Sequence, residues 1–556
     1  MKRLLPSPAT FMIILGLIFF SLGFADERAE KVDKLFSHWD KSDTPGCALA
    51  VVKDGEIIHK KGYGMADLEH QIPITPQSVF YVGSVSKQFV AFCVALLDKQ
   101  RKLSLDDDVR KYIPELPDYG TPITIRHLIH HTSGLRDYLA LEDIAGIPFG
   151  YYHQQDVMEL MARQRELNFK PGEEYLYSNS GYFLLAVIVE RASGRTLREL
   201  SEEKIFKPLG MENSRFHDDY AQIIKNRARG YFPAGDGKYK NYISTFDCVG
   251  SGGLYTSVED FFLWDQNFYH HKVGRKELID LIQTPGKLST GEELDYAFAL
   301  KIGKYRGLKT VGHGGALGGY RAGYIRFPQQ RFSVICLANL SSFNPIKLCH
   351  QVADIYLAGQ FTEKAKTEPR SGPGFIELPE KKLKEKAGTY LDRNTGEVRR
   401  IFFKDDRLIM KAFGQKFPLG PLSAMKFQVL GSPVEAVIEF EKKSKEKPLL
   451  MHLYVQGQKP ETFEAVKPVK PTPAQLREYE GEYHSEELEV TFKLALKEGK
   501  LYFVHRHAPE PPLLPTLQDR FTVRGFTIRF IRDQRGEISG FKLNAGRVRN
   551  LRFVRK

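Results

Sequence analysis

The N-terminal part of the chain begins with a helical hydrophobic pattern and then changes to an alternating one. Residues 26–40 have the spacing of an amphipathic helix. Two alternating segments follow, Cys47–Lys53 and Glu56–Gly64, and Asp54-Gly55 between them is a dipeptide typical of tight hairpin turns. These patterns predict a helix followed by a β-hairpin.

Hydrophobic spacing further along the chain predicts helices in the middle and strands near residue 340. The segments Ser84–Leu97, Ile123–His130 and Gly181–Ala192 have apolar positions at helical intervals. Alternating or continuous apolar runs at Ala322–Phe327 and Phe332–Leu340 predict two strands around a Pro-Gln-Gln turn. Strands at both ends with helices between them indicate one sheet that is assembled from both ends of a domain and covered by helices.

The pattern changes after a polar, Pro- and Gly-containing linker at Thr362–Gly374. Short alternating strands follow, and the segment Leu383–Tyr390 resembles Leu476–Tyr483, 93 residues later. Two strand-rich repeats of about 85 residues each predict two small antiparallel barrels. One sandwich built from both copies is the alternative.

The first residues have the features of an export signal. Lys2 and Arg3 precede the apolar run Phe11–Leu22, which ends in Gly23-Phe24-Ala25. This arrangement predicts a secretory signal that is cleaved after Ala25, giving a secreted or periplasmic protein. An uncleaved membrane anchor is the alternative, although the run is short for a membrane span. The expected domains are a signal at 1–25, a first domain at 26–365, and repeats at 376–467 and 473–556.

Composition and charge exclude several classes of protein. The 556 residues are 42% hydrophobic, enough to bury sizeable cores. The net charge of +13 lies mostly in residues 376–556, which hold 35 Lys and Arg against 24 Asp and Glu, whereas 26–375 is neutral. This excess is spread over many strand-like segments, so we expect no nucleic-acid partner. It suits a solvated surface or weak attraction to anionic cell-envelope polymers.

The cysteines indicate neither a disulfide framework nor a metal site. Their number is odd, their spacing matches no metal-binding pattern, and several lie within apolar segments. A disulfide between two of them remains open. The five are Cys47, Cys93, Cys248, Cys336 and Cys349. We expect no metal and no cofactor.

The motif Ser-x-x-Lys occurs four times, and its context distinguishes one copy. Ser84 follows an extended apolar segment and opens a helix with a buried stripe, so Lys87 lies one turn later beside the Ser84 hydroxyl. Desolvation and the positive helix end favour a neutral amine, which can accept the hydroxyl proton. An ordinary helix cap is the alternative. The other copies are Ser201/Lys204 and Ser444/Lys447, both expected to be solvated, and Ser423/Lys426.

Two further motifs could complete a site. In Tyr177-Ser-Asn179 a phenol could move protons and an amide could hold a substrate carbonyl; a core Tyr with a capping Asn is the alternative. In His313-Gly314-Gly315, glycines on a strand would let a substrate backbone approach, and an adjacent amide could donate to an oxyanion. A Gly-rich turn is the alternative there.

Together these motifs resemble the serine hydrolases that include class C β-lactamases, penicillin-binding DD-peptidases, D-aminopeptidases and related esterases. Their order and rough spacing match, and the resemblance spans roughly residues 45–345. It makes the His/Thr/Ser-rich stretch at 130–133 structural rather than metal-binding. It also extends over three further segments, Thr124–Leu135, Pro171–Glu173 and Gly252–Ser257.

The resemblance implies an α+β fold: a β-lactamase-like α/β/α catalytic domain with an antiparallel sheet and a helical part, followed by two lipocalin-like barrels. Ser84 would be the acylated nucleophile, Lys87 its base partner and Tyr177 the proton shuttle. Asn179 would bind the acyl-side amide, and the N–H groups of Ser84 and Ala316 would form the oxyanion hole. The implied substrate-binding residues are Asn179, His313, Gly314, Gly315 and Ala316.

The implied function is that of an exported serine hydrolase acting on peptides, amides or esters, with a D-amino-acid feature. His313-Gly-Gly stands where many β-lactamases have Lys-Thr-Gly. Loss of that cation weakens recognition of a substrate carboxylate and argues against efficient β-lactam hydrolysis. The alternative is a catalytically weak penicillin-binding or envelope-binding protein that uses its basic barrels. The barrels would hold the enzyme near anionic material or shape the mouth of the active site.

Overall fold

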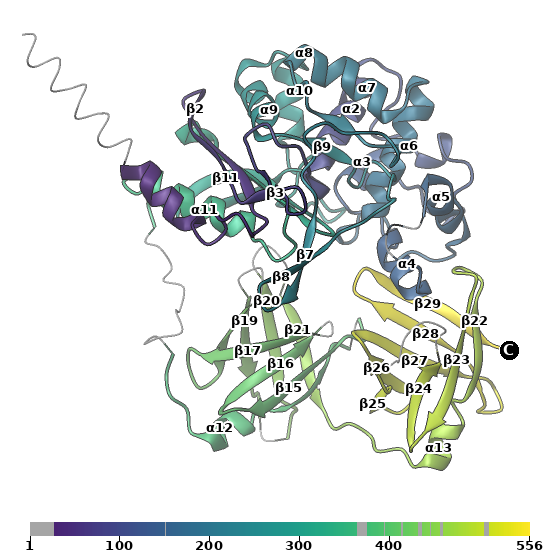
Figure 1. The fold of residues 1–556 in the computed structure, drawn as a ribbon. Coiled ribbons are helices and arrows are strands. Elements are labelled where there is room, and N and C mark those ends of the chain that lie inside the picture. The colour runs from purple at the N-terminus through teal and green to yellow at the C-terminus, as the bar shows by residue number, and fades with distance from the viewer. Residues whose placement is uncertain are drawn as a thin grey trace, which may run out of the picture.

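The computed structural model divides the chain into a mixed helix-and-sheet domain and two eight-stranded antiparallel sheets (Figure 1). The expected signal and most of the expected linker lie outside the described residues. Described are 27–148, 150, 152–363, 375–393, 395–412, 415–431, 436–444, 446–455, 460–504 and 511–556. Among them, no helix is long and apolar enough to cross a membrane.

A six-stranded antiparallel sheet in the order β10-β11-β12-β13-β1-β2 forms the centre of the first domain. Cys47 in β1 pairs with Ala338 in β13, so the two ends of the domain meet in the middle of the sheet. The predicted assembly and its hairpin are confirmed. The strands are β1 (Cys47–Lys53), β2 (Glu56–Tyr63), β10 (Lys301–Tyr305), β11 (Leu308–Leu317), β12 (Tyr320–Phe327) and β13 (Phe332–Ala338).

Helices cover both faces of this sheet because its central strands are buried on both sides. In β1, Leu49 and Val51 pack in a core with the N-terminal helix at 27–36 and α11 (Pro345–Tyr356). Ala48, Ala50 and Val52 face the larger helical part, which includes α2 (Lys87–Lys99), α6 (Asn179–Ser193) and α9 (Val258–His270). The layers are therefore helix, sheet and helix.

The three predicted middle helices are confirmed, with shifted ends. A 3₁₀ turn, η1 (Gly83–Ser86), precedes α2, and α3 (Ile125–Ile129) starts after a Thr124 capping box. Helix α6 ends at Gly194, whose φ of 72° favours glycine. The remaining helices are α4 (Tyr138–Ala145), α5 (Gln154–Arg163), α7 (Leu197–Ser201), the π-helix η3 (Glu202–Phe206), α8 (Lys207–Leu209) and α10 (Arg275–Ile282), with 3₁₀ turns η2 (Val109–Lys111) and η4 (Pro328–Gln330).

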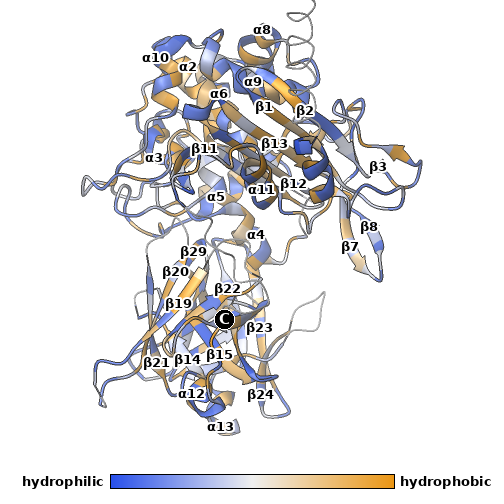
Figure 2. Cartoon of the chain, turned by 90° about the vertical axis from the view of Figure 1, so that its left-hand side faces the viewer, coloured by the Kyte–Doolittle hydropathy of each residue, from blue (hydrophilic) through white to orange (hydrophobic). Residues whose placement is uncertain are grey.

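Small sheets border the helical part of this domain. Strand β9 (Leu254–Thr256) pairs with β5 (Phe80–Tyr81), which leads directly into the Ser84 turn. Strands β7 (Tyr231–Gly235) and β8 (Lys238–Asn241) form a hairpin that extends from the domain (Figure 2). The others are β3 (Met65–Asp67), β4 (Ile72–Pro73) and β6 (Arg215–Phe216).

The repeats form two barrels, and a single sandwich is excluded because each repeat has its own eight-stranded sheet. The first, β14–β21, is closed, and the second runs from β24 through β22 and β29 to β25. Each follows a short helix, α12 (Glu380–Lys384) or α13 (Pro473–Arg477). Buried and more exposed residues alternate along strands such as Arg407–Ala412 and Ala436–Glu441, and both hydrophobic and hydrophilic positions are visible on the barrels in Figure 2.

The strand bounds follow the repeat. The first barrel contains β14 (Gly388–Leu391), β15 (Val398–Lys404), β16 (Arg407–Ala412), β17 (Gln415–Pro421), β18 (Lys426–Val429), β19 (Ala436–Glu441), β20 (Leu450–Val455) and β21 (Glu461–Val466). The second contains β22 (Gly481–Ser485), β23 (Val490–Lys497), β24 (Lys500–Val504), β25 (Leu514–Leu517), β26 (Arg520–Val523), β27 (Phe526–Arg532), β28 (Ile538–Ala545) and β29 (Val548–Arg555). The five cysteines are all free and buried, which answers the question of a disulfide.

A buried ion pair joins the second barrel to the helical part of the first domain. The Arg136 guanidinium pairs with Glu487, and their side chains are 0% and 7% exposed. Arg136 also donates to Gln164 Oε1 at 3.1 Å. Glu487 accepts from the backbone N–H of Arg165 at 2.7 Å. The core residues of this barrel belong to the same hydrophobic cluster as the helical part, so the two pack as one unit.

We expect Glu487→Gln to destabilise the protein by about 3–5 kcal/mol, because it leaves the buried Arg136 charge without its counter-ion. The free energy of unfolding can be measured by urea denaturation. Glu489→Gln is the matched control, because its partner Arg163 is 3.5 Å away and Glu489 is 65% exposed. Equal stabilities of the two variants would contradict a structural role for the buried pair.

Candidate active site

Ser84 lies in the 3₁₀ turn η1, directly against strand β11. The approach is so close that a Cβ atom at Gly315 would lie 1.9 Å from the carbonyl oxygen of Val82 and 3.3 Å from the Ser84 nitrogen. Gly83 has a φ of 53°, and a Cβ there would lie 2.6 Å from the Ala316 nitrogen. The expected reason for Gly315 was access for substrate, whereas its close neighbour is the Ser84 turn itself. The two glycines bring the backbone nitrogens of Ser84 and Ala316 to the same end of the site.

Lys87 is buried and has three polar neighbours. Its Nζ lies 3.0 Å from Ser84 Oγ and 3.0 Å from Asn179 Oδ1, and it donates to the carbonyl oxygen of Ser251. Burial lowers the pKa of Lys87 well below its usual value, partly opposed by the nearby Asp137 carboxylate, while Arg547 lowers it further. The uncharged amine is therefore the favoured form.

The partners of Lys87 determine where its lone pair points. The Asn179 Nδ2 group donates to Asp137 Oδ2 at 2.9 Å, so the Oδ1 atom must face the lysine. This amide oxygen and the Ser251 carbonyl oxygen can only accept hydrogen bonds. A neutral amine has two N–H groups, and both are used by these acceptors. Its lone pair is then left for the Ser84 hydroxyl, which can donate its proton to Lys87.

Tyr177 places a phenol beside the same serine. Burial raises the pKa of Tyr177 far above its usual value, an effect that the neighbouring Ser84 hydroxyl and Arg547 only partly offset. Its oxygen is buried and makes no hydrogen bond of normal geometry to any described residue. Lys87 Nζ lies 5.0 Å from the centre of the Tyr177 ring. The resting side chain is thus a protonated phenol that can donate a proton.

A chain of hydrogen bonds determines the protonation of His313. The Ser178 N–H donates to His131 Nδ1 at 3.2 Å, so His131 Nε2 carries the proton and faces Tyr296 Oη at 3.2 Å. The Tyr296 hydroxyl then donates to His313 Nε2 at 3.0 Å. His313 Nδ1 donates to the Gly314 carbonyl oxygen at 2.6 Å. Burial lowers the pKa of His313 to about 4, so this strand supplies a neutral group at neutral pH.

The three other Ser-x-x-Lys copies do not place an amine beside a hydroxyl. Ser201 is buried, and the prediction that it is solvated was wrong, because α7 packs this face against the domain core. Its hydroxyl donates to the Arg198 carbonyl oxygen. The hydroxyls of Ser423 and Ser444 each accept the backbone N–H of the lysine of their own motif.

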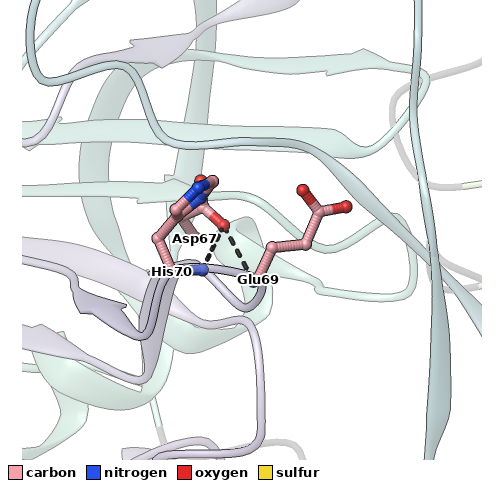
Figure 3. A group of neighbouring side chains, drawn as sticks. All are labelled: Asp67, Glu69 and His70. Atoms are coloured by element: carbon pink, nitrogen blue, oxygen red, sulfur yellow. Dashed lines mark hydrogen bonds and ion pairs between the residues drawn. The ribbon is translucent and has the colours of Figure 1, made fainter.

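One cluster of possible metal ligands is present among the described residues, and its contacts stabilise a turn. Figure 3 shows its members, Asp67, Glu69 and His70. Asp67 accepts the backbone N–H groups of both others and pairs with Arg229 at 3.1 Å. Glu69 pairs with Arg229 and accepts from Asn241 at 2.6 Å. Protein cations and donors already satisfy these carboxylates.

The structure adds residues that sequence reasoning did not select. Asp137, Ser251 and Tyr296 orient Asn179, Lys87 and His313, yet none belongs to a recognised motif. Asp137 caps α4, and Ser251 lies in a loop before β9. A Gly-rich sequence around Ser251 is the one visible signal for that residue. The predicted catalytic group Ser84, Lys87 and Tyr177 does lie together, with Asn179 and His313 on either side.

Comparison with known proteins gives consistent matches. The curated D-aminopeptidase of Gluconobacter oxydans (strain 621H) is 32% identical over 359 residues, covering 64% of this chain and 65% of that protein. The D-aminopeptidase of Brucella canis is 32% identical over 303 residues, covering 53% and 56%. The chain thus spans less than two thirds of the length of either relative.

Solved structures and the family comparison agree with the fold. The octameric penicillin-binding protein homologue from Pyrococcus abyssi matches with a TM-score of 0.55 and 26% identity, covering 78% of this chain and 99% of that one. The Beta-lactamase family matches residues 32–348, which include the six-stranded sheet, the helical part, Ser84, Lys87, Tyr177, Asn179 and His313. This chain therefore belongs to the beta-lactamase family.

Proposed function

We propose that the protein is an exported serine hydrolase that forms an acyl-enzyme on Ser84 and cleaves peptide, amide or ester substrates. The observation that carries this proposal is the orientation of Lys87. Its two N–H groups have acceptors in Asn179 and Ser251, and its lone pair remains for the Ser84 hydroxyl. Such an arrangement activates a serine without a histidine base.

In the proposed reaction, the Ser84 hydroxyl gives its proton to Lys87 while its oxygen attacks the substrate carbonyl carbon. The N–H groups of Ser84 and Ala316 hold the oxyanion that forms. Tyr177 donates its proton to the leaving amine or alkoxide as the bond to the carbonyl carbon breaks, and it recovers a proton from Lys87. Water then attacks the acyl carbon and gives a proton to the same groups, which pass that proton to Ser84 as its bond to the acyl group breaks.

The second amide hydrogen of Asn179 and the matches to known proteins support a substrate class. Asn179 has one amide hydrogen beyond the one given to Asp137, and this hydrogen can bind the carbonyl of an acyl-side amide. The matches to D-aminopeptidases support an amide or peptide with a D-amino acid on the acyl side. Export is supported by the basic and apolar N-terminal sequence that ends at Ala25.

A second candidate is an envelope-binding protein with little turnover. Its support is the charge of +11 on residues 376–556, beside a neutral first domain. Such a protein would adhere to anionic polymers through the barrels, and adhesion would weaken with salt. Turnover of acylated Ser84 separates the two functions, because a pure binder would hold the acyl group without releasing it.

We expect Ser84→Ala to abolish labelling by a fluorophosphonate probe and all hydrolysis, because it removes the attacking oxygen. Ser201→Ala, Ser423→Ala and Ser444→Ala are matched controls in the same motif and should label normally. Intact-protein mass spectrometry and a gel with a fluorescent probe measure the adduct. Labelling that persists in Ser84→Ala would show that the nucleophile lies elsewhere.

We expect Tyr177→Phe to reduce turnover by about 10²-fold or more, within the usual range for a general acid or base. The raised pKa of Tyr177 keeps its phenol protonated beside Ser84, so it can donate a proton. Steady-state rates with D-alanine p-nitroanilide measure the effect. Tyr175→Phe serves as control, because burial also raises the pKa of that phenol but Ser84, which lowers the pKa of Tyr177, has no such effect on Tyr175. An unchanged rate in Tyr177→Phe would assign the proton donor to another group.

The rate of Ser84 labelling should fall as the pH is lowered. Burial lowers the pKa of Lys87, so the amine is neutral above that lowered value and loses its lone pair as the pH falls through it. Labelling rates from acidic to mildly alkaline pH measure the midpoint. Arg547 also lowers this pKa, so Arg547→Gln should move the midpoint to higher pH. A pH-independent rate would exclude Lys87 as the base.

A further inference from the structure

A hairpin of the second barrel extends to the catalytic serine region. Strands β28 and β29 are joined by the two residues Gly546 and Arg547, and Gly546 has a φ of 53°, as a tight hairpin turn requires. Figure 1 shows these yellow strands reaching the blue helix α4 of the first domain. Arg547 is therefore at the tip, where it meets residues of the site.

Backbone hydrogen bonds hold this tip in place. The Arg547 carbonyl oxygen accepts from Asn168 Nδ2 at 2.9 Å and from the Asp137 N–H at 3.3 Å. The Arg549 N–H donates to Asn168 Oδ1 at 2.7 Å, and its carbonyl oxygen accepts from Arg136 Nε at 3.0 Å. None of these bonds involves the Arg547 side chain. They hold the Arg547 backbone in place and leave its guanidinium unrestrained.

The Arg547 guanidinium lies beside the proposed catalytic group, and its N–H groups donate to no described residue. Its Cζ is 4.8 Å from the centre of the Tyr177 ring, and its NH1 is 3.6 Å from Asp137 Oδ2. That carboxylate oxygen already accepts from the backbone N–H and Nδ2 of Asn179. The guanidinium makes no hydrogen bond to the part of the chain that the structure describes, and the side chain is 45% exposed.

The neighbouring groups leave a role for this cation. Lys87 is buried and favoured in its neutral form, and His313, which stands where many family members have lysine, is neutral at physiological pH. Neither can therefore hold a substrate carboxylate by charge. A guanidinium can bind a carboxylate through two parallel hydrogen bonds, and this one lies on the Asn179 side of the site.

We propose that Arg547, carried into the site by the second barrel, selects substrates with a carboxylate on the acyl portion that lies beside Asn179. The proposal rests on the proposed function, since Asn179 is there the group that binds the acyl-side amide. It adds a substrate class, acyl groups with an anionic side chain, such as an acidic D-amino acid. It also assigns a specificity-determining role to the C-terminal barrel.

The test compares the α-p-nitroanilides of D-glutamate and D-glutamine, which have the same shape and differ in one negative charge. We expect the native enzyme to favour the D-glutamyl substrate in kcat/KM by about tenfold, the usual size of a charge-assisted hydrogen-bond effect. Arg547→Gln should bring this ratio close to one, and raised salt should reduce it. Arg552→Gln is the control, because it removes an exposed positive charge from β29, the strand that follows Arg547.

Binding to Ser84→Ala protein separates this inference from the proposed function. Isothermal titration calorimetry with the same two anilides should show tighter binding of the D-glutamyl compound, lost in Ser84→Ala/Arg547→Gln. Equal binding of both compounds, or a preference that survives Arg547→Gln, would overturn the role of Arg547 even if Ser84 is acylated. A preference that depends on Arg547 supports it even if fluorophosphonate fails to label Ser84, a result that refutes only the proposed function.

Discussion

Burial of the Lys87 amine is the constraint on which the rest of the site depends. A charged ammonium without a close carboxylate is too costly in this environment, so the protein favours the neutral amine. The surrounding groups match that form. Two acceptors take its two N–H bonds, and the nearest carboxylate, Asp137, interacts with the amide of Asn179 rather than with the lysine directly. A shorter Asp137–Lys87 contact would favour the charged ammonium and so remove the proposed base.

The fold maintains this arrangement through close backbone contacts. Strand β11 is an inner strand of the main sheet, and Gly315 lets it touch the turn that carries Ser84. Helix α2 carries Lys87 and packs against α6, whose first residue is Asn179. The sheet thus contributes the strand that contains Gly315 and Ala316, and the helical part contributes Lys87 and Asn179. A small shift between them would separate Ser84, the proposed nucleophile, from the Ala316 N–H, a proposed oxyanion donor.

The second barrel is part of this architecture rather than an independent appendage. Its buried Glu487 neutralises Arg136. At the next residue in the chain, the Asp137 N–H donates to the Arg547 carbonyl oxygen in the β28–β29 hairpin. Asp137 in turn orients Asn179. The two consecutive residues Arg136 and Asp137 therefore contact the second barrel, and Asp137 also contacts Asn179, which accepts from Lys87. Changes in barrel packing can therefore alter the position of Asn179 and of Lys87, the proposed base.

The sequence by itself determined the elements whose signals are local. The hairpin at residues 47–63, the strands that close the sheet and the Ser84 helix follow from hydrophobic periodicity and turn residues. The internal repeat predicted two barrels, and each copy does form its own eight-stranded sheet. The placement of Lys87 beside Ser84 follows from helix geometry, since residues three apart lie on one face.

Only the tertiary structure decided which distant residues complete the site. Ser251 and Arg547 contact residues more than 150 positions away, and no periodicity encodes such contacts. Burial of Ser201 also depended on packing, since its own sequence of charged neighbours indicated exposure. Local patterns specify secondary structure, because it depends on near neighbours. The protonation of Lys87 and His313 depends on desolvation by the whole fold, and chain order alone does not contain that information.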